Sequence, residues 1–150
     1  MNVKNYLDST YLKTPQQAGI SEKEDINIVN GFVQEAIEED FKLVMIRPNR
    51  VKLAKQIITA AHSKVSVGTV IGFPEGTYSL EEKLAEAQQA INDGADDLDF
   101  VCNYEAFKNG NVNLALCHYV YNHYVYRHLI CSHFVYTDCV EEVSELLYMK

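Results

Sequence analysis

The sequence lacks a long apolar run, a CxxC pair and an excess of positive charge. No stretch approaches the roughly 18 consecutive apolar residues of a transmembrane helix, and the N-terminus MNVKNYLDST has no apolar signal segment. The 13 Lys and Arg against 21 Asp and Glu give a formal charge of −8, which still allows a small site for a phosphorylated metabolite. Four cysteines without CxxC spacing fit reduced thiols. We therefore expect a cytoplasmic protein that binds neither nucleic acid nor membrane.

Up to about Leu114, short β-rich runs alternate with segments of helical periodicity. This alternation is typical of a parallel sheet with crossover helices, and it predicts a single α/β domain core without a linker. Strands are expected at NYLDST near the start, at Lys42–Ile46, at Val65–Phe73 and at Asp97–Asn103. Helices are expected at about residues 22–39, from Val51 to Ala61, and from Leu80 to the glycine at position 94.

Capping residues support two of these helices. Ser21 with Glu24 and Ser79 with Glu82 have the spacing of capping boxes, in which each side chain accepts a backbone N–H of the other residue. Gly94 suits the left-handed position that follows a helix end. The predicted order is therefore four consecutive strand and helix units.

Four segments carry a resemblance to a known family: LDSTYLKTP (Leu7–Pro15), VMIRPNRVKLAK (Val44–Lys55), GTVIGFPEGTYSLEEKLAEAQQAI (Gly68–Ile91) and NDGADDLDFVCNYEAFKNG (Asn92–Gly110). Together they resemble deoxyribose-phosphate aldolases over about residues 5–114. The resemblance implies a (β/α)8 TIM barrel, of which residues 1–114 would form the first four units. It also implies a cytoplasmic class I lyase of deoxyribonucleotide and carbohydrate catabolism. That enzyme reversibly cleaves 2-deoxy-D-ribose 5-phosphate to glyceraldehyde 3-phosphate and acetaldehyde through a lysine Schiff base, without metal or cofactor.

By this resemblance, three residues belong to the catalytic site. Asp99 matches the aspartate that shuttles protons, and Asp97, two positions earlier, is its alternative; equally, Asp99 could only cap the next turn. Asp8 matches a proton-relay residue and Thr10 a contact to a substrate hydroxyl, although both could instead form a local turn. Met45 replaces a cysteine found in many relatives and would narrow the aldehyde pocket.

Other polar and glycine residues in this half have simpler interpretations. Gly68, Gly72 and Gly76 fit no phosphate-loop spacing, so we expect them to serve barrel packing. Arg47 and Arg50 flank Pro48 and could meet a phosphate, but a solvated loop is the simpler expectation. Five lysines are expected to be solvated surface charges: Lys42, Lys52, Lys55, Lys64 and Lys83.

The segment from residue 115 to 150 differs in character and holds four of the five histidines. A five-residue repeat places His118, His123, His128 and His133 in register, yet this spacing gathers them on one side of neither a helix nor a strand, which disfavours a metal site. Residues 140–147 read as a short amphipathic helix. No lysine lies between Lys108 and Lys150, so the sequence offers no Schiff-base lysine there. We therefore interpret the chain as a truncated or frame-shifted aldolase, with a Tyr/His/Cys-rich tail that is frame-shifted or foreign to the family.

Three functions from different classes remain open. The chain could be an aldolase family member that is inactive alone. It could be a non-catalytic half-barrel that self-associates through two exposed sheet edges. It could also be an independent small α/β binding module.

Overall fold

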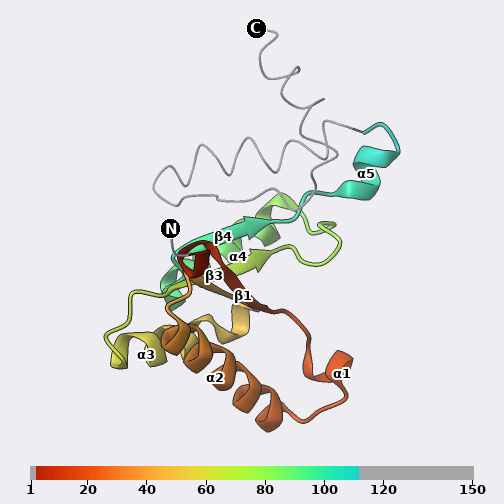
Figure 1. The fold of residues 1–150 in the computed structure, drawn as a ribbon. Coiled ribbons are helices and arrows are strands. Elements are labelled where there is room, and N and C mark those ends of the chain that lie inside the picture. The colour runs from red at the N-terminus through yellow and green to blue at the C-terminus, as the bar shows by residue number, and fades with distance from the viewer. Residues whose placement is uncertain (1–2, 112–150) are drawn as a thin grey trace, which may run out of the picture.

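The structure is a computed structural model, and it describes residues 3–111. Its elements in chain order are η1 (Val3–Tyr6), β1 (Asp8–Tyr11), α1 (Pro15–Ala18), α2 (Glu22–Glu39), β2 (Leu43–Ile46), η2 (Pro48–Arg50), α3 (Val51–Ala60), β3 (Ser66–Ile71), α4 (Leu80–Asp93), β4 (Asp97–Phe100) and α5 (Tyr104–Lys108). Figure 1 shows the strands side by side, with helices packed beneath and behind them.

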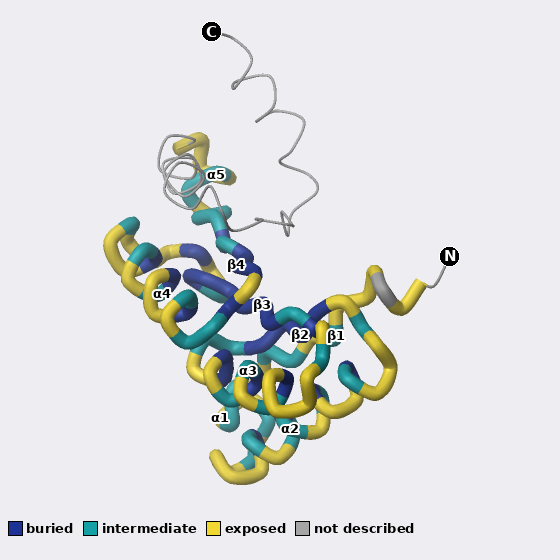
Figure 2. Tube along the Cα trace, turned by 90° about the vertical axis from the view of Figure 1, so that its left-hand side faces the viewer, coloured by how far each residue is buried: buried dark blue, intermediate teal, exposed yellow. Residues whose placement is uncertain are grey.

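The four strands form one parallel sheet in the order β1-β2-β3-β4. Because successive side chains on a strand point to opposite faces, the register separates two faces of this sheet. One face carries Val44, Ile46, Val67, Ile71 and Leu98, which pack with apolar residues of α2, α3 and α4. Figure 2 shows buried strands at the centre and exposed outer sides of these helices. We call this side the helix face and the opposite side the inner face.

The sequence predicted the strand order and the helices well. α2 begins at Glu22 and ends at Glu39, and both expected capping boxes are present. Gly94 follows α4 with a φ of 101°, as its predicted role requires. These agreements arise because caps and periodicity are local signals that packing does not override here.

Several boundaries differ from expectation. The first strand begins at Asp8 rather than at position 5, because Val3–Tyr6 form a 3-10 helix. β3 ends at Ile71, since Gly72 turns the chain with a φ of 72°. The short helix α1, capped by Thr14, and the short helix α5, capped by Asn103, were not expected. The predictions for residues 115–150, including the histidine repeat and the helix at 140–147, lie outside the described residues.

Candidate functional site

The inner face of the sheet brings the predicted site residues onto one side. The register aligns Thr10 with Met45, Met45 with Gly68 and Gly68 with Asp97 in one row across all four strands. Asp8 and Asp99 each lie two positions from a member of this row, so they share its face. The sheet therefore places all three residues matched to the family, and the alternative Asp97, on the inner face.

The two aspartates of β4 are both buried. Asp97 is 7% exposed and Asp99 is 8% exposed. Asp99 lies next to Phe100, the last residue of β4, and thus near the carboxyl end of the strand, where barrel enzymes place catalytic groups. The following helix α5 is capped by Asn103, whose side chain accepts the Ala106 N–H at 3.0 Å. That helix cap is thus supplied by Asn103 and not by Asp99.

Asp8 and Thr10 lie at the other edge of the sheet, on β1, and both are exposed. Three strand spacings separate β1 from β4, which amounts to roughly 14 Å along the sheet. Along the sheet, Asp99 thus lies three strands away from Asp8 and Thr10. A ligand lying across the inner face would have to bridge the two edges.

An apolar patch occupies the middle of the inner face. Leu43, Met45 and Val70 are buried there, with Leu12 and Phe73 packed against them. A Cβ placed on Gly68 would lie 2.7 Å from Met45 Cε and 2.9 Å from Leu43 Cδ2. The ends of the Met45 and Leu43 side chains thus occupy the space above Gly68, and a side chain there would require them to shift.

The loop between β3 and α4 packs against the end of β4. Gly76 has a φ of 68°, and a Cβ there would lie 1.9 Å from the carbonyl oxygen of Cys102. At Gly72, a Cβ would lie 2.7 Å from Lys83 Cε. The prediction that these glycines serve packing rather than phosphate binding agrees with this geometry.

The expectation that Lys83 is a solvated surface charge is wrong. Its side chain is 0% exposed, and its Nζ donates to the carbonyl oxygens of Gly76 at 2.8 Å and Val101 at 2.7 Å. The signal was in the sequence, since Lys83 precedes Ala87 and Ala90 at helical spacing on the buried stripe of α4. By contrast, Lys42, Lys52 and Lys64 are exposed as predicted.

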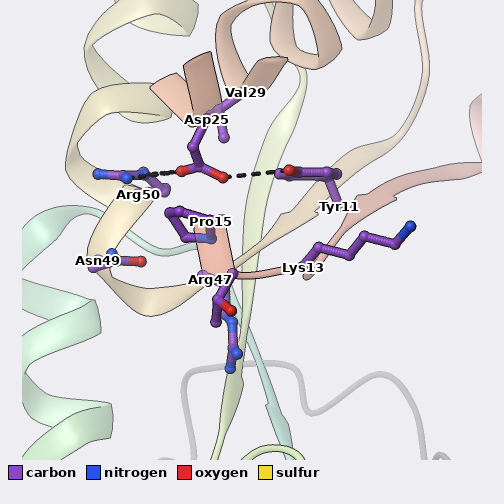
Figure 3. A pocket seen from close by; sticks show the side chains of 9 residues that line it. Tyr11, Lys13, Pro15, Asp25, Val29, Arg47, Asn49 and Arg50 are labelled. Atoms are coloured by element: carbon purple, nitrogen blue, oxygen red, sulfur yellow. Dashed lines mark hydrogen bonds and ion pairs between the residues drawn. The ribbon is translucent and has the colours of Figure 1, made fainter. Parts of the chain in front are cut away.

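Arg50 also departs from the predicted solvated loop. Its guanidinium is buried against α2, where Nε donates to Asp25 Oδ2 at 2.8 Å and a second nitrogen pairs with Glu22. Tyr11 donates to the other Asp25 oxygen at 3.3 Å. Figure 3 shows this carboxylate between the guanidinium and the phenol. Asp25 was missed because sequence reasoning followed only the apolar positions of α2, although Asp25 precedes Val29 and Val33 on the same stripe.

This polar network has definite electrostatic effects. Burial, together with the charge of Asp25, raises the pKa of the Tyr11 phenol. Burial alone would lower the pKa of the Arg50 guanidinium, but its hydrogen bonds to Glu22 and Asp25 leave that pKa raised. The network joins β1, α2 and η2 and keeps Arg50 in its ion pairs.

A small pocket adjoins this network. Its lining includes Tyr11, Lys13, Asp25, Arg47 and Arg50 (Figure 3). Tyr11 neighbours Thr10 on β1 and therefore points to the helix face. Arg47 places its guanidinium over the Phe73 ring, 5.2 Å from the centroid. Phe73 packs against the apolar patch of the inner face, so Arg47 connects this pocket with that patch.

Two further properties concern the described residues only. Between residues 3 and 111, no three His, Cys, Asp or Glu side chains are grouped so that they could hold a metal ion. In the same part of the chain, no helix is long and apolar enough to cross a membrane.

Comparison with known proteins finds similarity to aldolases. The profile of the family described as DeoC/LacD family aldolase matches residues 7–119. A deoxyribose-phosphate aldolase of Thermococcus gammatolerans is 41% identical over 111 residues, which are 74% of this chain and 46% of that protein. A crystal structure of a putative deoxyribose-phosphate aldolase from Coccidioides immitis superposes with a TM-score of 0.73 at 28% identity, over 86% of this chain and 47% of that one.

A solved structure described as "QR15, an Aldolase" has a TM-score of 0.64 at 36% identity, over 79% of this chain and 48% of that one. The chain spans about half the length of the curated relatives that it matches. The four-stranded parallel sheet therefore corresponds to part of the fold of these aldolases.

Proposed function

The chain belongs to the DeoC/LacD aldolase family, and from this we propose that it contributes the acid–base half of a site that cleaves 2-deoxy-D-ribose 5-phosphate. The observation that carries the proposal is the inner face, where Asp99 lies buried at the carboxyl end of β4 and Asp8 and Thr10 stand at the opposite edge. The products would be glyceraldehyde 3-phosphate and acetaldehyde. The location we propose is the cytoplasm.

Asp99 has a defined task in this chemistry. When an amine adds to the substrate carbonyl, the carbinolamine must lose water, and the enamine left after carbon–carbon cleavage must gain a proton. One carboxyl group can serve these steps in turn. It gives a proton to the leaving hydroxyl, regains one as a carboxylate from the substrate hydroxyl whose carbon becomes the released aldehyde when the carbon–carbon bond breaks, and then passes that proton to the enamine carbon. Thr10 would bind a substrate hydroxyl, and Asp8 would relay protons beside it.

The amine itself is the part that this half does not supply. Strands β1–β4 contain no lysine, and the resemblance places the Schiff-base lysine on a later strand of the barrel. Lys83 is buried in α4 with its Nζ donating to two carbonyls, so it presents no lone pair to a substrate. We propose that the chain alone forms no Schiff base and is inactive, and that a complementary half supplies the lysine.

Reductive trapping tests this proposal. The full chain is incubated with 2-deoxy-D-ribose 5-phosphate and borohydride, and the intact mass is measured. We expect no sugar-derived mass increase on this chain alone, whereas a full-length deoxyribose-phosphate aldolase treated in parallel should gain one. A stable adduct on a lysine of this chain would show that the chain holds its own nucleophile, and would overturn the division of the site that we propose.

A second function is favoured by the sheet edges. In the described part of the chain, β1 and β4 each have a neighbouring strand on one side only, and strand edges can pair with other strands. The chain could therefore self-associate as a half-barrel without catalysis. Light scattering across a range of protein concentrations decides this, because a monomer at every concentration would rule out self-association.

A further inference from the structure

The Lys83 ammonium group forms hydrogen bonds to two separate backbone segments. The two carbonyls that it binds belong to Gly76, in the β3–α4 loop, and to Val101, the residue after β4. A fully buried charge is costly unless hydrogen bonds compensate its lost hydration. A lysine ammonium has three N–H donors and no acceptor, which suits a position where carbonyl oxygens converge.

Glu86 acts on the same loop from the next turn of α4. Its Oε2 accepts the backbone N–H of Gly72 at 2.7 Å, where the chain leaves β3. The loop closes on itself, since the Gly76 N–H donates to the Gly72 carbonyl at 2.8 Å. Lys83 and Glu86 together therefore bind both ends of the short Gly72–Gly76 turn.

The Gly72–Gly76 turn packs directly against the segment that follows β4. Gly76 approaches the Val101 and Cys102 carbonyls so closely that no side chain fits between them. The Val101 N–H donates to Ile71 O at 2.9 Å, which ties the same segment to β3. Any shift of the turn is thereby passed to Val101, two residues beyond Asp99.

We propose that Lys83 and Glu86 are positioning residues that form a clamp, the α4 clamp, which fixes the carboxyl end of β4 and with it the backbone that carries Asp99. Only the role of Asp99 as proton shuttle rests on the proposed function. The clamp acts from the helix side and touches no substrate. Lys83 is accordingly a buried cross-link and not the amine that attacks the sugar.

The test compares Lys83→Met with Lys55→Met in the full chain. Met has a similar length and favours helices but cannot donate to the carbonyls. Lys55 is a matched control because its Nζ pairs with Asp96, which precedes β4 at the opposite end of the strand. Backbone amide exchange by NMR reports the local effect, and the 13C titration midpoint of the Asp99 carboxyl reports a shift in its surroundings.

In Lys83→Met, we expect amide exchange at Gly76 and Val101 to accelerate roughly tenfold or more relative to Val33 in α2, because charge-assisted hydrogen bonds are lost. The Asp99 midpoint should also move. Lys55→Met should change neither quantity. An Ile58→Val variant serves as a control for general destabilisation, because it weakens only the helix-face core. It should accelerate amide exchange throughout the described part of the chain without moving the titration midpoint of Asp99. Uniform acceleration in Lys83→Met, or an unmoved Asp99 midpoint, would overturn the proposal.

A milder variant covers the case in which Lys83→Met does not fold. Glu86→Met removes the acceptor of the Gly72 N–H at a partly exposed position, and it should accelerate exchange at Gly72 and Gly76 while α2 stays protected. Unchanged exchange at both glycines would contradict the clamp. These measurements use no substrate, so they can fail or succeed independently of the borohydride experiment.

Discussion

Replacing Gly76 with alanine should be far more damaging than the same change at another glycine with the same backbone angle. Gly76 and Gly19 have φ values of 68° and 67°. An alanine in this left-handed region costs about 1–2 kcal/mol at either site. A Cβ at Gly19 meets nothing within 4 Å, whereas one at Gly76 would lie 1.9 Å from Cys102 O. Only the second substitution must push two backbone segments apart.

The added cost at Gly76 follows from that separation. Overpacking in a well-packed region costs about 1–3 kcal/mol, and here the obstructing atoms are backbone, which cannot rotate away. We therefore expect Gly76→Ala to lose about 3 kcal/mol or more of unfolding free energy, and Gly19→Ala about 1–2 kcal/mol. In urea denaturation followed by circular dichroism, with an m value of about 2 kcal/mol/M, this difference of about 1–2 kcal/mol should separate the two midpoints by roughly 0.5–1 M. Equal midpoints would refute the contact between the β3–α4 loop and β4.

Three further predictions concern the polar contacts of the helices. Arg50→Met should cost about 3 kcal/mol or more in the same assay, because it leaves the Asp25 carboxylate buried without its guanidinium; a loss below about 1 kcal/mol would contradict the network. Ser79→Ala should cost about 1 kcal/mol through the lost cap, and an unchanged midpoint would show that the cap is idle. Hydrogen bonds from the Ser79 backbone and hydroxyl hold the pKa of Glu82 below its ordinary 4.5. The ionised Glu82 carboxylate therefore stabilises the folded chain above pH 4.5, and this stabilisation is lost as the pH falls through the lower pKa of the folded state. Glu82→Gln should accordingly reduce the loss of unfolding free energy below pH 4.5.

Much of the fold follows from local sequence signals. The capping boxes at Ser21 and Ser79 and the terminal glycine at position 94 mark their helices without reference to the rest of the chain. The buried run Leu43–Ile46 needs apolar residues on both faces, and such a run indicates an internal parallel strand. Asp8, Thr10 and Asp99 lie on one face of the sheet because of the register between its strands. The family resemblance implied that these residues share a site, whereas composition alone did not.

The predictions from sequence failed for two charged side chains that are buried in the structure. Lys83 and Arg50 were assigned to solvent because isolated charged side chains are seldom buried. Both are buried because backbone carbonyls or carboxylates from distant segments meet them, and those partners lie 7 to 28 positions away in the chain. The only sequence signal for their burial is that each lies on or beside the buried stripe of a helix. A charge on an apolar stripe is thus better interpreted as a buried, paired group.

The most direct test of the account asks which aspartate the chemistry needs. The full chain is mixed with the complementary half of the Thermococcus gammatolerans relative, and cleavage of 2-deoxy-D-ribose 5-phosphate is followed by an aldehyde-coupled assay. We predict turnover only with both halves, lowered about 10²- to 10⁴-fold by Asp99→Asn but largely kept by Asp97→Asn, its buried neighbour on the same face. Full turnover with Asp99→Asn, or cleavage by this chain alone, would contradict the account.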